Sequence, residues 1–208
     1  MKNVAIIVAH PDDETLWAGG TILSNPNWNW KIFCLTREDD PDRAPRFQKV
    51  LSYYGASGEM DKLPDDPDQE PLKISEVTKS IMGLIGPHPD FDLVITHGLK
   101  GEYTRHRRHE EVSFAVTNMW LDEELNSRGI WLFAYEDGDG QNPPRPEEGS
   151  ERFPLSLELW RKKRYLVEEV YGFAPESWEA RVNPRVEAFR KFETKKALRE
   201  WLNGGENQ

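Results

Sequence analysis

An apolar run of six residues, Val4 to Ala9, ends abruptly in a histidine and three acids, His10-Pro11-Asp12-Asp13-Glu14. The run has the length and composition of a buried strand, and a helix-like stretch follows the acids. This order predicts that the polar side chains lie at the carboxyl end of a strand, where open α/β sheets bind their ligands. Acids are also favoured at helix N-termini, but that explanation does not account for His10.

A second group of histidines follows a second apolar run. Leu93 to Thr96 has the composition of another buried strand, and His106-Arg107-Arg108-His109 later opens a helical pattern. Because residues three apart share one face of a helix, His106 and His109 can both point into one cleft. One of them, with His10 and Asp13, would complete the three protein ligands that a catalytic zinc uses beside a water. The residues alone do not decide which histidine binds.

These two blocks resemble those of the LmbE-like, or PIG-L, family of zinc-dependent de-N-acetylases. That family carries an A/P-H-P-D-D-E block after its first strand and an H-x-x-H block at the start of a later helix. The resemblance spans roughly residues 1 to 171. The matching segments are Ala9 to Glu14, Thr96-His97, Gly101-Glu102-Tyr103 and His106 to His109, with weaker matches at Leu63-Pro64-Asp65 and Lys163 to Tyr171.

The resemblance implies a role for each matching residue. His10, Asp13 and His109 match the zinc ligands. Asp12 matches the general base that takes a proton from the zinc-bound water, and His106 matches the protonated residue that assists departure of the amine. Zinc lowers the pKa of bound water from about 15.7 to about 7, and a histidine can supply the proton that an amide nitrogen needs to leave. Iron(II) is compatible with the same nitrogen and oxygen ligands.

Further candidates lie near these blocks. The family tends to place a substrate-binding arginine on the helix after the second strand, and two arginines lie in that region here. One tryptophan is close to the first block, and an arginine directly precedes the second, where it could contact a negatively charged substrate. The candidates for substrate contact are Arg43, Arg46, Trp17 and Arg105, and those that could support a ligand from behind are Glu14 and His97.

Strands alternate with helices along the chain, which favours βαβ units. We therefore predict an α/β fold, a Rossmann-like three-layer sandwich with a mostly parallel central sheet. One domain is expected over residues 1–208, with a C-terminal helical extension at about 183–202. The loop at 137–154 is a candidate lid. Strands are expected at 4–9, 30–36, 92–96 and 130–135, and helices at about 14–24, 44–55, 70–85, 107–125, 156–170 and 183–202.

Charge and composition exclude some classes of protein. The formal net charge of −10 argues against a nucleic-acid partner. No apolar run approaches the ~20 residues of a membrane span. The N-terminal run is too short for a signal-peptide core, so a cytoplasmic location is expected. The single cysteine, Cys34, can form neither an internal disulfide nor a paired-cysteine zinc site. The sequence leaves a homo-oligomer open.

The expected activity is that of a zinc-dependent N-deacetylase, a hydrolase of linear amide bonds. Its partner would be a small N-acylated substrate, an N-acetylated sugar such as N-acetylglucosamine or a sugar conjugate. Two alternatives stay open: the same chemistry on another amide, such as a thiol-sugar conjugate or an antibiotic precursor, and a non-catalytic Rossmann-like module that binds a nucleotide or a sugar. Against the module, no Gly-x-Gly-x-x-Gly loop follows the first strand, and Gly19-Gly20 come too late.

Overall fold

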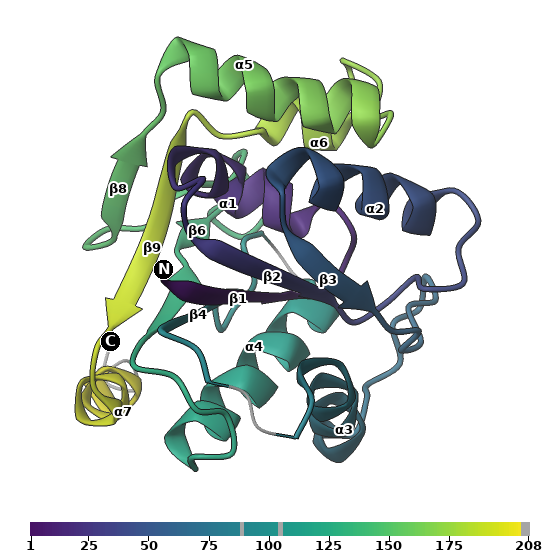
Figure 1. The fold of residues 1–208 in the computed structure, drawn as a ribbon. Coiled ribbons are helices and arrows are strands. Elements are labelled where there is room, and N and C mark those ends of the chain that lie inside the picture. The colour runs from purple at the N-terminus through teal and green to yellow at the C-terminus, as the bar shows by residue number, and fades with distance from the viewer. Residues whose placement is uncertain (88–89, 104–105, 205–208) are drawn as a thin grey trace.

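The computed structural model describes residues 1–87, 90–103 and 106–204. Its centre is a seven-stranded sheet (Figure 1). The strands are β1 (Asn3–Val8), β2 (Asn29–Cys34), β3 (Ser57–Met60), β4 (Leu93–Thr96), β5 (Ile130–Phe133), β8 (Glu151–Pro154) and β9 (Val186–Phe192), and β6 (Tyr135–Glu136) pairs separately with β7 (Arg145–Pro146). The order is β3-β2-β1-β4-β5-β9-β8; the first five are parallel, and β9 runs antiparallel to both of its neighbours.

Helices cover both faces of this sheet (Figure 1). The α1, α2 and α5 helices lie on one face, and α3, α4 and α7 lie on the other. This arrangement confirms the predicted three-layer α/β fold with a mostly parallel sheet. The helices are α1 (Asp13–Ser24), α2 (Arg43–Tyr54), α3 (Ile74–Ile85), α4 (Arg107–Leu121), α5 (Leu157–Tyr165), which continues into a π-helical turn (Leu166–Val170), α6 (Trp178–Val182) and α7 (Lys195–Gly204).

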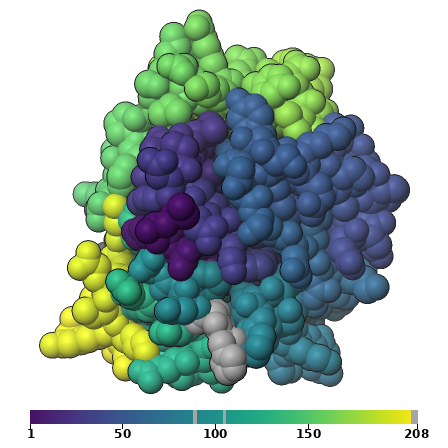
Figure 2. Space-filling model, in the orientation of Figure 1, coloured from purple at the N-terminus to yellow at the C-terminus, as the bar shows by residue number. Residues whose placement is uncertain are grey.

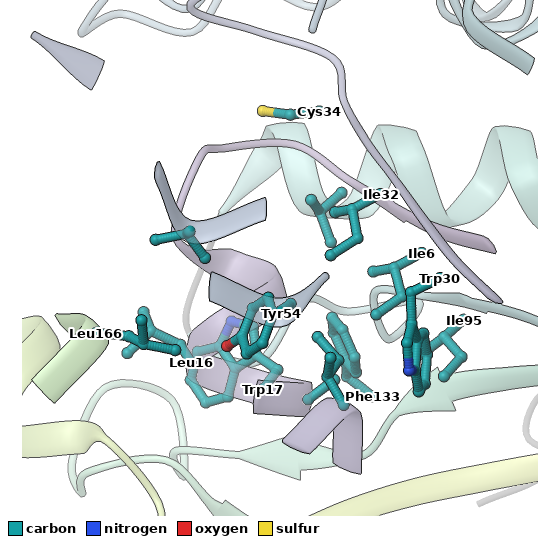
Figure 3. Close-up of a cluster of buried hydrophobic side chains, with 14 of the residues drawn as sticks. Ile6, Leu16, Trp17, Trp30, Ile32, Cys34, Tyr54, Ile95, Phe133 and Leu166 are labelled. Atoms are coloured by element: carbon teal, nitrogen blue, oxygen red, sulfur yellow. The ribbon is translucent and has the colours of Figure 1, made fainter. Parts of the chain in front are cut away.

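The β1 strand is apolar along most of its length because both of its faces are buried. Val4, Ile6 and Val8 pack towards α1 and α2, whereas Ala5 and Ile7 pack towards α3 and α4. Strands that are buried on both sides carry continuous apolar runs instead of an alternating pattern. Figure 3 shows part of the apolar cluster between the sheet and the helices α1 and α2, in which side chains from the strands meet those of the two helices.

The pairing of β1 with β4 brings the two polar blocks to the same edge of the sheet. The strands are parallel, and Ile7 lies opposite Thr96. The residues that follow each strand, His10 and His97 among them, therefore leave the sheet side by side. Most of the candidate site is built at this edge.

The expected helix over 183–202 is wrong. Its first part is the strand β9, and α7 begins at Lys195. Val186, Phe189 and Phe192 follow helical spacing, but the segment pairs with β5 on one side and with β8 on the other. Those pairings satisfy the backbone of β9 within the sheet, so tertiary context outweighs the local pattern. The short strands β3 and β8 were not expected either.

The segment 137–154 contains β7 and β8. Asp137, Gly138, Asp139, Glu147 and Glu148 line a cavity distinct from the one that contains His10, although Tyr103 lines both. None of the described helices is long and apolar enough to cross a membrane. The start of the chain, dark purple in Figure 2, lies on the surface of the molecule, where Met1 is 95% exposed.

Candidate metal centre and active site

Three donor atoms from distant parts of the chain form a small triangle. His10 Nδ1 lies 3.2 Å from Asp13 Oδ2 and 3.1 Å from His109 Nε2, and the last two atoms are 3.3 Å apart. A tetrahedral metal with bonds of about 2.0–2.1 Å separates its ligand atoms by about 3.3–3.4 Å. The triangle therefore has the dimensions of one face of a zinc or iron site. His10 follows β1, Asp13 begins α1, and His109 lies in the first turn of α4.

A tight turn between β1 and α1 presents the acids of the first block. The Asp13 N–H donates to the His10 carbonyl at 3.3 Å, and the His10 N–H donates to Asp13 Oδ2 at 2.8 Å. Asp12 has a φ of 145°, a conformation that costs a residue other than glycine about 1–3 kcal/mol. Its N–H donates to Glu14 Oε2 at 3.1 Å, which helps to hold this conformation. The strain is thus located at the residue that matches the general base.

Each of the two histidines in the triangle has a carboxylate on its other ring nitrogen. His109 Nδ1 lies 2.6 Å from Glu102 Oε2, and His10 Nε2 lies 3.2 Å from Asp65 Oδ1. Asp65 in turn accepts from the Arg37 guanidinium at 2.6 Å. Metal-binding histidines usually donate their second N–H to a carboxylate or a carbonyl, which fixes the ring orientation and the tautomer. The carboxylates on His10 and His109 are thus placed as they usually are around metal-binding histidines.

Other combinations of nearby donors are geometrically close. His106 lies within reach of His10 and His109, and His97 lies within reach of Asp13 and His109. Both ring nitrogens of His97 are already engaged, with Ala9 N–H at 3.0 Å and with Glu102 at 2.9 Å. His97 is therefore a poor ligand. The set of His10, His106 and His109 has no carboxylate, whereas the triangle includes Asp13, whose negative charge favours a divalent cation.

The charges around the triangle favour a cation. Burial lowers the pKa of His109, but Asp13 and Glu102 outweigh it and raise that pKa to about 10. Burial raises the pKa of Asp13, yet His109 and His97 bring it well below its ordinary value. The carboxylates are thus held in their charged form. A divalent cation would neutralise part of this buried negative charge.

Asp12 and His106 lie beside the triangle in a different electrostatic setting. Burial and the nearby Asp13 raise the pKa of Asp12 well above its ordinary value. Burial and the neighbouring His109 lower the pKa of His106 to about 2. The His106 ring stacks on His109 with 4.0 Å between centroids, and its Nδ1 is buried without a hydrogen-bond partner among the described residues. His106 is therefore neutral in this setting.

A cavity of about 480 Å³ opens beside these residues. One part of its wall is polar, with Arg37, Asp65 and Gln69, and another part is aromatic, with Tyr103 and Trp178. The two rings lie 4.3 Å apart between centroids. Polar groups next to an aromatic surface are a common arrangement in pockets for small polar molecules.

The structure separates the two candidate arginines. Arg43 lines the cavity, its Nη1 lies 3.7 Å from Asp12 Oδ2, and its guanidinium sits 4.5 Å from the centre of the Phe173 ring. Arg46 does not line this cavity; it pairs with Asp42 at 2.7 Å. Because it lines the cavity, Arg43 is better placed than Arg46 to contact a substrate.

The other candidates lie as follows. Trp17 is fully buried, packs on Tyr135 with 4.8 Å between ring centroids, and does not line the cavity, so its position does not support a substrate contact. Glu14 is fully buried behind the first block, where it accepts from the Tyr171 hydroxyl at 2.7 Å. Arg105 lies outside the described residues.

Sequence reasoning did not assign Asp65, Glu102, Arg37 or Trp178 to the site. Glu102 and Asp65 fall within segments that match the family pattern, so a signal was present for both. Arg37 and Trp178 carry no such signal. Arg37 reaches the cavity because it follows the end of β2, and Trp178 reaches it because α6 begins there.

The fold and this cluster define an α/β protein with a nitrogen and oxygen donor set at the carboxyl edge of its sheet. A family model described as "PIG-L: GlcNAc-PI de-N-acetylase" matches residues 5–120. That match covers more than half of the chain, and it contains both the β1 block and the histidine pair. The chain belongs to the PIG-L family.

One viral protein is similar in sequence to this chain. "Uncharacterized protein L374" of Acanthamoeba polyphaga mimivirus is 22% identical over 154 residues, a match that covers 66% of this chain and 64% of that protein. The match thus spans less than two thirds of the relative's length.

Solved structures that resemble this fold include two deacetylases and a hydratase. N,N'-diacetylchitobiose deacetylase from Pyrococcus horikoshii has a TM-score of 0.67 at 19% identity, covering 92% of this chain and 84% of that one. The zinc-inhibited form of teicoplanin deacetylase Orf2 has 0.65 at 13%, covering 92% and 98%. GalB, a 4-carboxy-2-hydroxymuconate hydratase from Pseudomonas putida, has 0.58 at 15%, covering 92% and 96%. Since the last is a hydratase, the fold alone does not select deacetylation.

Proposed function

We propose that this protein is a metal-dependent hydrolase that removes an acetyl or other acyl group from the amide nitrogen of an N-acylated sugar or sugar conjugate. The observation that carries the proposal is the triangle of His10 Nδ1, Asp13 Oδ2 and His109 Nε2, with sides of 3.1–3.3 Å, beside a buried Asp12. Membership of the PIG-L family supports the same reaction.

When bound, Zn²⁺ or Fe²⁺ would polarise the amide carbonyl and make a water acidic enough to deprotonate near neutral pH. His10, Asp13 and His109 would hold it. Asp12 would take the proton from the attacking water through its carboxylate. Arg43, 3.7 Å from that carboxylate, would favour its charged form before the transfer.

His106 would act at the leaving nitrogen. It is neutral at the start, because burial and the neighbouring His109 lower its pKa to about 2. Negative charge that develops on the carbonyl oxygen favours protonation of a nearby imidazole, and the proton that Asp12 has taken from water is a source for it. His106 would then protonate the amide nitrogen as the C–N bond breaks, which gives a carboxylic acid and a free amine.

The cavity wall supports a sugar as the substrate. A pyranose has hydroxyl groups around its edge and apolar C–H groups on its faces. Arg37, Asp65 and Gln69 offer donors and acceptors, and Tyr103 and Trp178 offer aromatic surface. The similar structures include proteins named for N,N'-diacetylchitobiose and for teicoplanin, so we propose an N-acetyl amino sugar first and an acylated glycoside second.

Asp12→Asn gives the most direct test of the proposed chemistry. Protein loaded with zinc or iron is given N-acetylglucosamine, its oligomers and acylated glycosides, and the free amine is measured. The variant should bind the metal as the wild type does and lose at least about 100-fold in kcat, since general-base catalysis contributes about 10²–10⁴-fold. Asp39→Asn, an exposed carboxylate, is the matched control and should keep full activity. Unchanged kcat in Asp12→Asn would exclude Asp12 as the base.

A further inference from the structure

Glu102 lies where three segments of the site meet. It is fully buried. Its Oε2 atom is 2.9 Å from His97 Nδ1, after β4, and 2.6 Å from His109 Nδ1, in α4. Its Oε1 atom accepts the Gly98 N–H at 2.9 Å. One carboxylate thus collects three N–H groups, two of them from imidazole rings that stack on each other with 3.9 Å between centroids.

His97 is held from both sides of its ring. Its Nε2 atom accepts the N–H of Ala9, the residue before His10, at 3.0 Å. A nitrogen that accepts carries no proton, so the ring proton of neutral His97 lies on Nδ1 and is donated to Glu102. His97 therefore connects Glu102 to the backbone at the end of β1, where the proposed ligand His10 begins.

We propose that Glu102 is a positioning residue for the metal centre, acting through two histidines at once. It fixes His109 as the Nδ1–H tautomer, which leaves the lone pair of Nε2 for the metal. It fixes His97 in the same tautomer, which leaves Nε2 to hold the Ala9 N–H. This inference rests on the proposed metal site.

An amide cannot replace the carboxylate at this position. If the oxygen of a glutamine faces the two histidines, its NH₂ group faces the Gly98 N–H, and two donors meet in a buried space. If the amide is turned, the NH₂ group faces both Nδ1 atoms, which must then accept. The ring proton of His109 moves to Nε2 in that case and occupies the position of the metal. Either orientation weakens the site.

The test compares Glu102→Gln with Glu187→Gln. Glu187 is also fully buried and also accepts several donors, from Gly20 and Thr21 of α1, but it makes none of the contacts of the metal cluster. Zinc affinity is measured by competition with a chromophoric chelator. Glu102→Gln should bind zinc about 10- to 100-fold more weakly than the wild type. Glu187→Gln should lose stability and keep the zinc affinity.

A direct measurement on the wild type covers the case in which Glu102→Gln does not fold. The chain has five histidines, so long-range ¹H–¹⁵N correlation spectra of the zinc-loaded protein can assign the tautomer of each ring. His97 and His109 should both carry the proton on Nδ1. A proton on Nε2 of His97, or equal zinc affinity in Glu102→Gln and the wild type, would overturn the inference. A wild type that binds no zinc or iron would instead refute the proposed function itself.

Discussion

A buried ion pair between α5 and β9 allows a quantitative test of the fold. Lys163 in α5 and Glu187 in β9 are both fully buried, and Lys163 Nζ lies 2.9 Å from Glu187 Oε1. Glu187 also accepts the backbone N–H groups of Gly20 and Thr21, at 2.6 and 2.7 Å. The pair therefore joins three elements: α1, α5 and the strand that extends the sheet beyond β5.

Lys163→Met keeps most of the side-chain volume and removes the charge. Loss of one partner from a buried pair costs about 3–5 kcal/mol, because the other charge is left uncompensated. Glu187 keeps its hydrogen bonds from α1, so we expect the lower end, about 3 kcal/mol. For a chain of this size that corresponds to a fall in Tm of about 6–12 °C. Adding Glu187→Gln to Lys163→Met should recover part of the loss, because it removes the buried charge.

The assay is urea unfolding followed by circular dichroism, with the slope of the transition compared between variants. Lys162→Met is the matched control: the adjacent lysine of the same helix pairs with Glu158 at 2.7 Å on the surface. Exposed pairs contribute little, so its urea midpoint should hardly move. If Lys163→Met proved as stable as Lys162→Met, the buried pair would not hold these three elements together.

Three further predictions concern the site. Arg43→Met should lower kcat and keep the metal, because Arg43 lies beside Asp12, whereas Arg46→Met should keep activity; equal effects would refute the distinction. Burial lowers the pKa of His109, but two neighbouring carboxylates raise it to about 10, so zinc must displace a proton from His109 at lower pH. Zinc affinity should therefore rise with pH up to about pH 10; titration calorimetry showing no proton release at pH 7 would contradict this. Gly98→Ala should lower Tm, since its Cβ would lie 2.7 Å from a backbone carbonyl oxygen; an unchanged Tm would show that the backbone yields there.

Much of the site's location could be predicted because it follows from short segments. A buried parallel strand is a continuous apolar run, and the polar residues after it must leave at the carboxyl edge of the sheet. His10 and Asp13 come after β1, and His97 comes after β4, its neighbour in the sheet. The family pattern then indicated His109, and not His106, as the third metal ligand, a choice that helical periodicity alone could not make.

The rest depends on contacts between distant residues. Asp65 lies in an acidic segment with two prolines, a composition typical of an exposed loop, yet its Oδ1 atom lies 3.2 Å from His10 Nε2. Glu102 lies in a segment that matches the family pattern, but that pattern does not show that one carboxylate contacts both His97 and His109. The strand β9 has apolar residues at helical spacing, and only its two neighbouring strands make it extended. Local sequence does not encode such partners.

The proposed metal-dependent hydrolysis is tested most directly by the metal content and the amide hydrolysis of the wild type and of His10→Ala, measured on the same preparations. Elemental analysis counts zinc and iron per chain, and release of free amine from N-acetylglucosamine and its conjugates reports activity. We expect about one metal per wild-type chain, and loss of both metal and activity in His10→Ala. A wild type that takes up neither zinc nor iron and hydrolyses no amide would contradict the proposal.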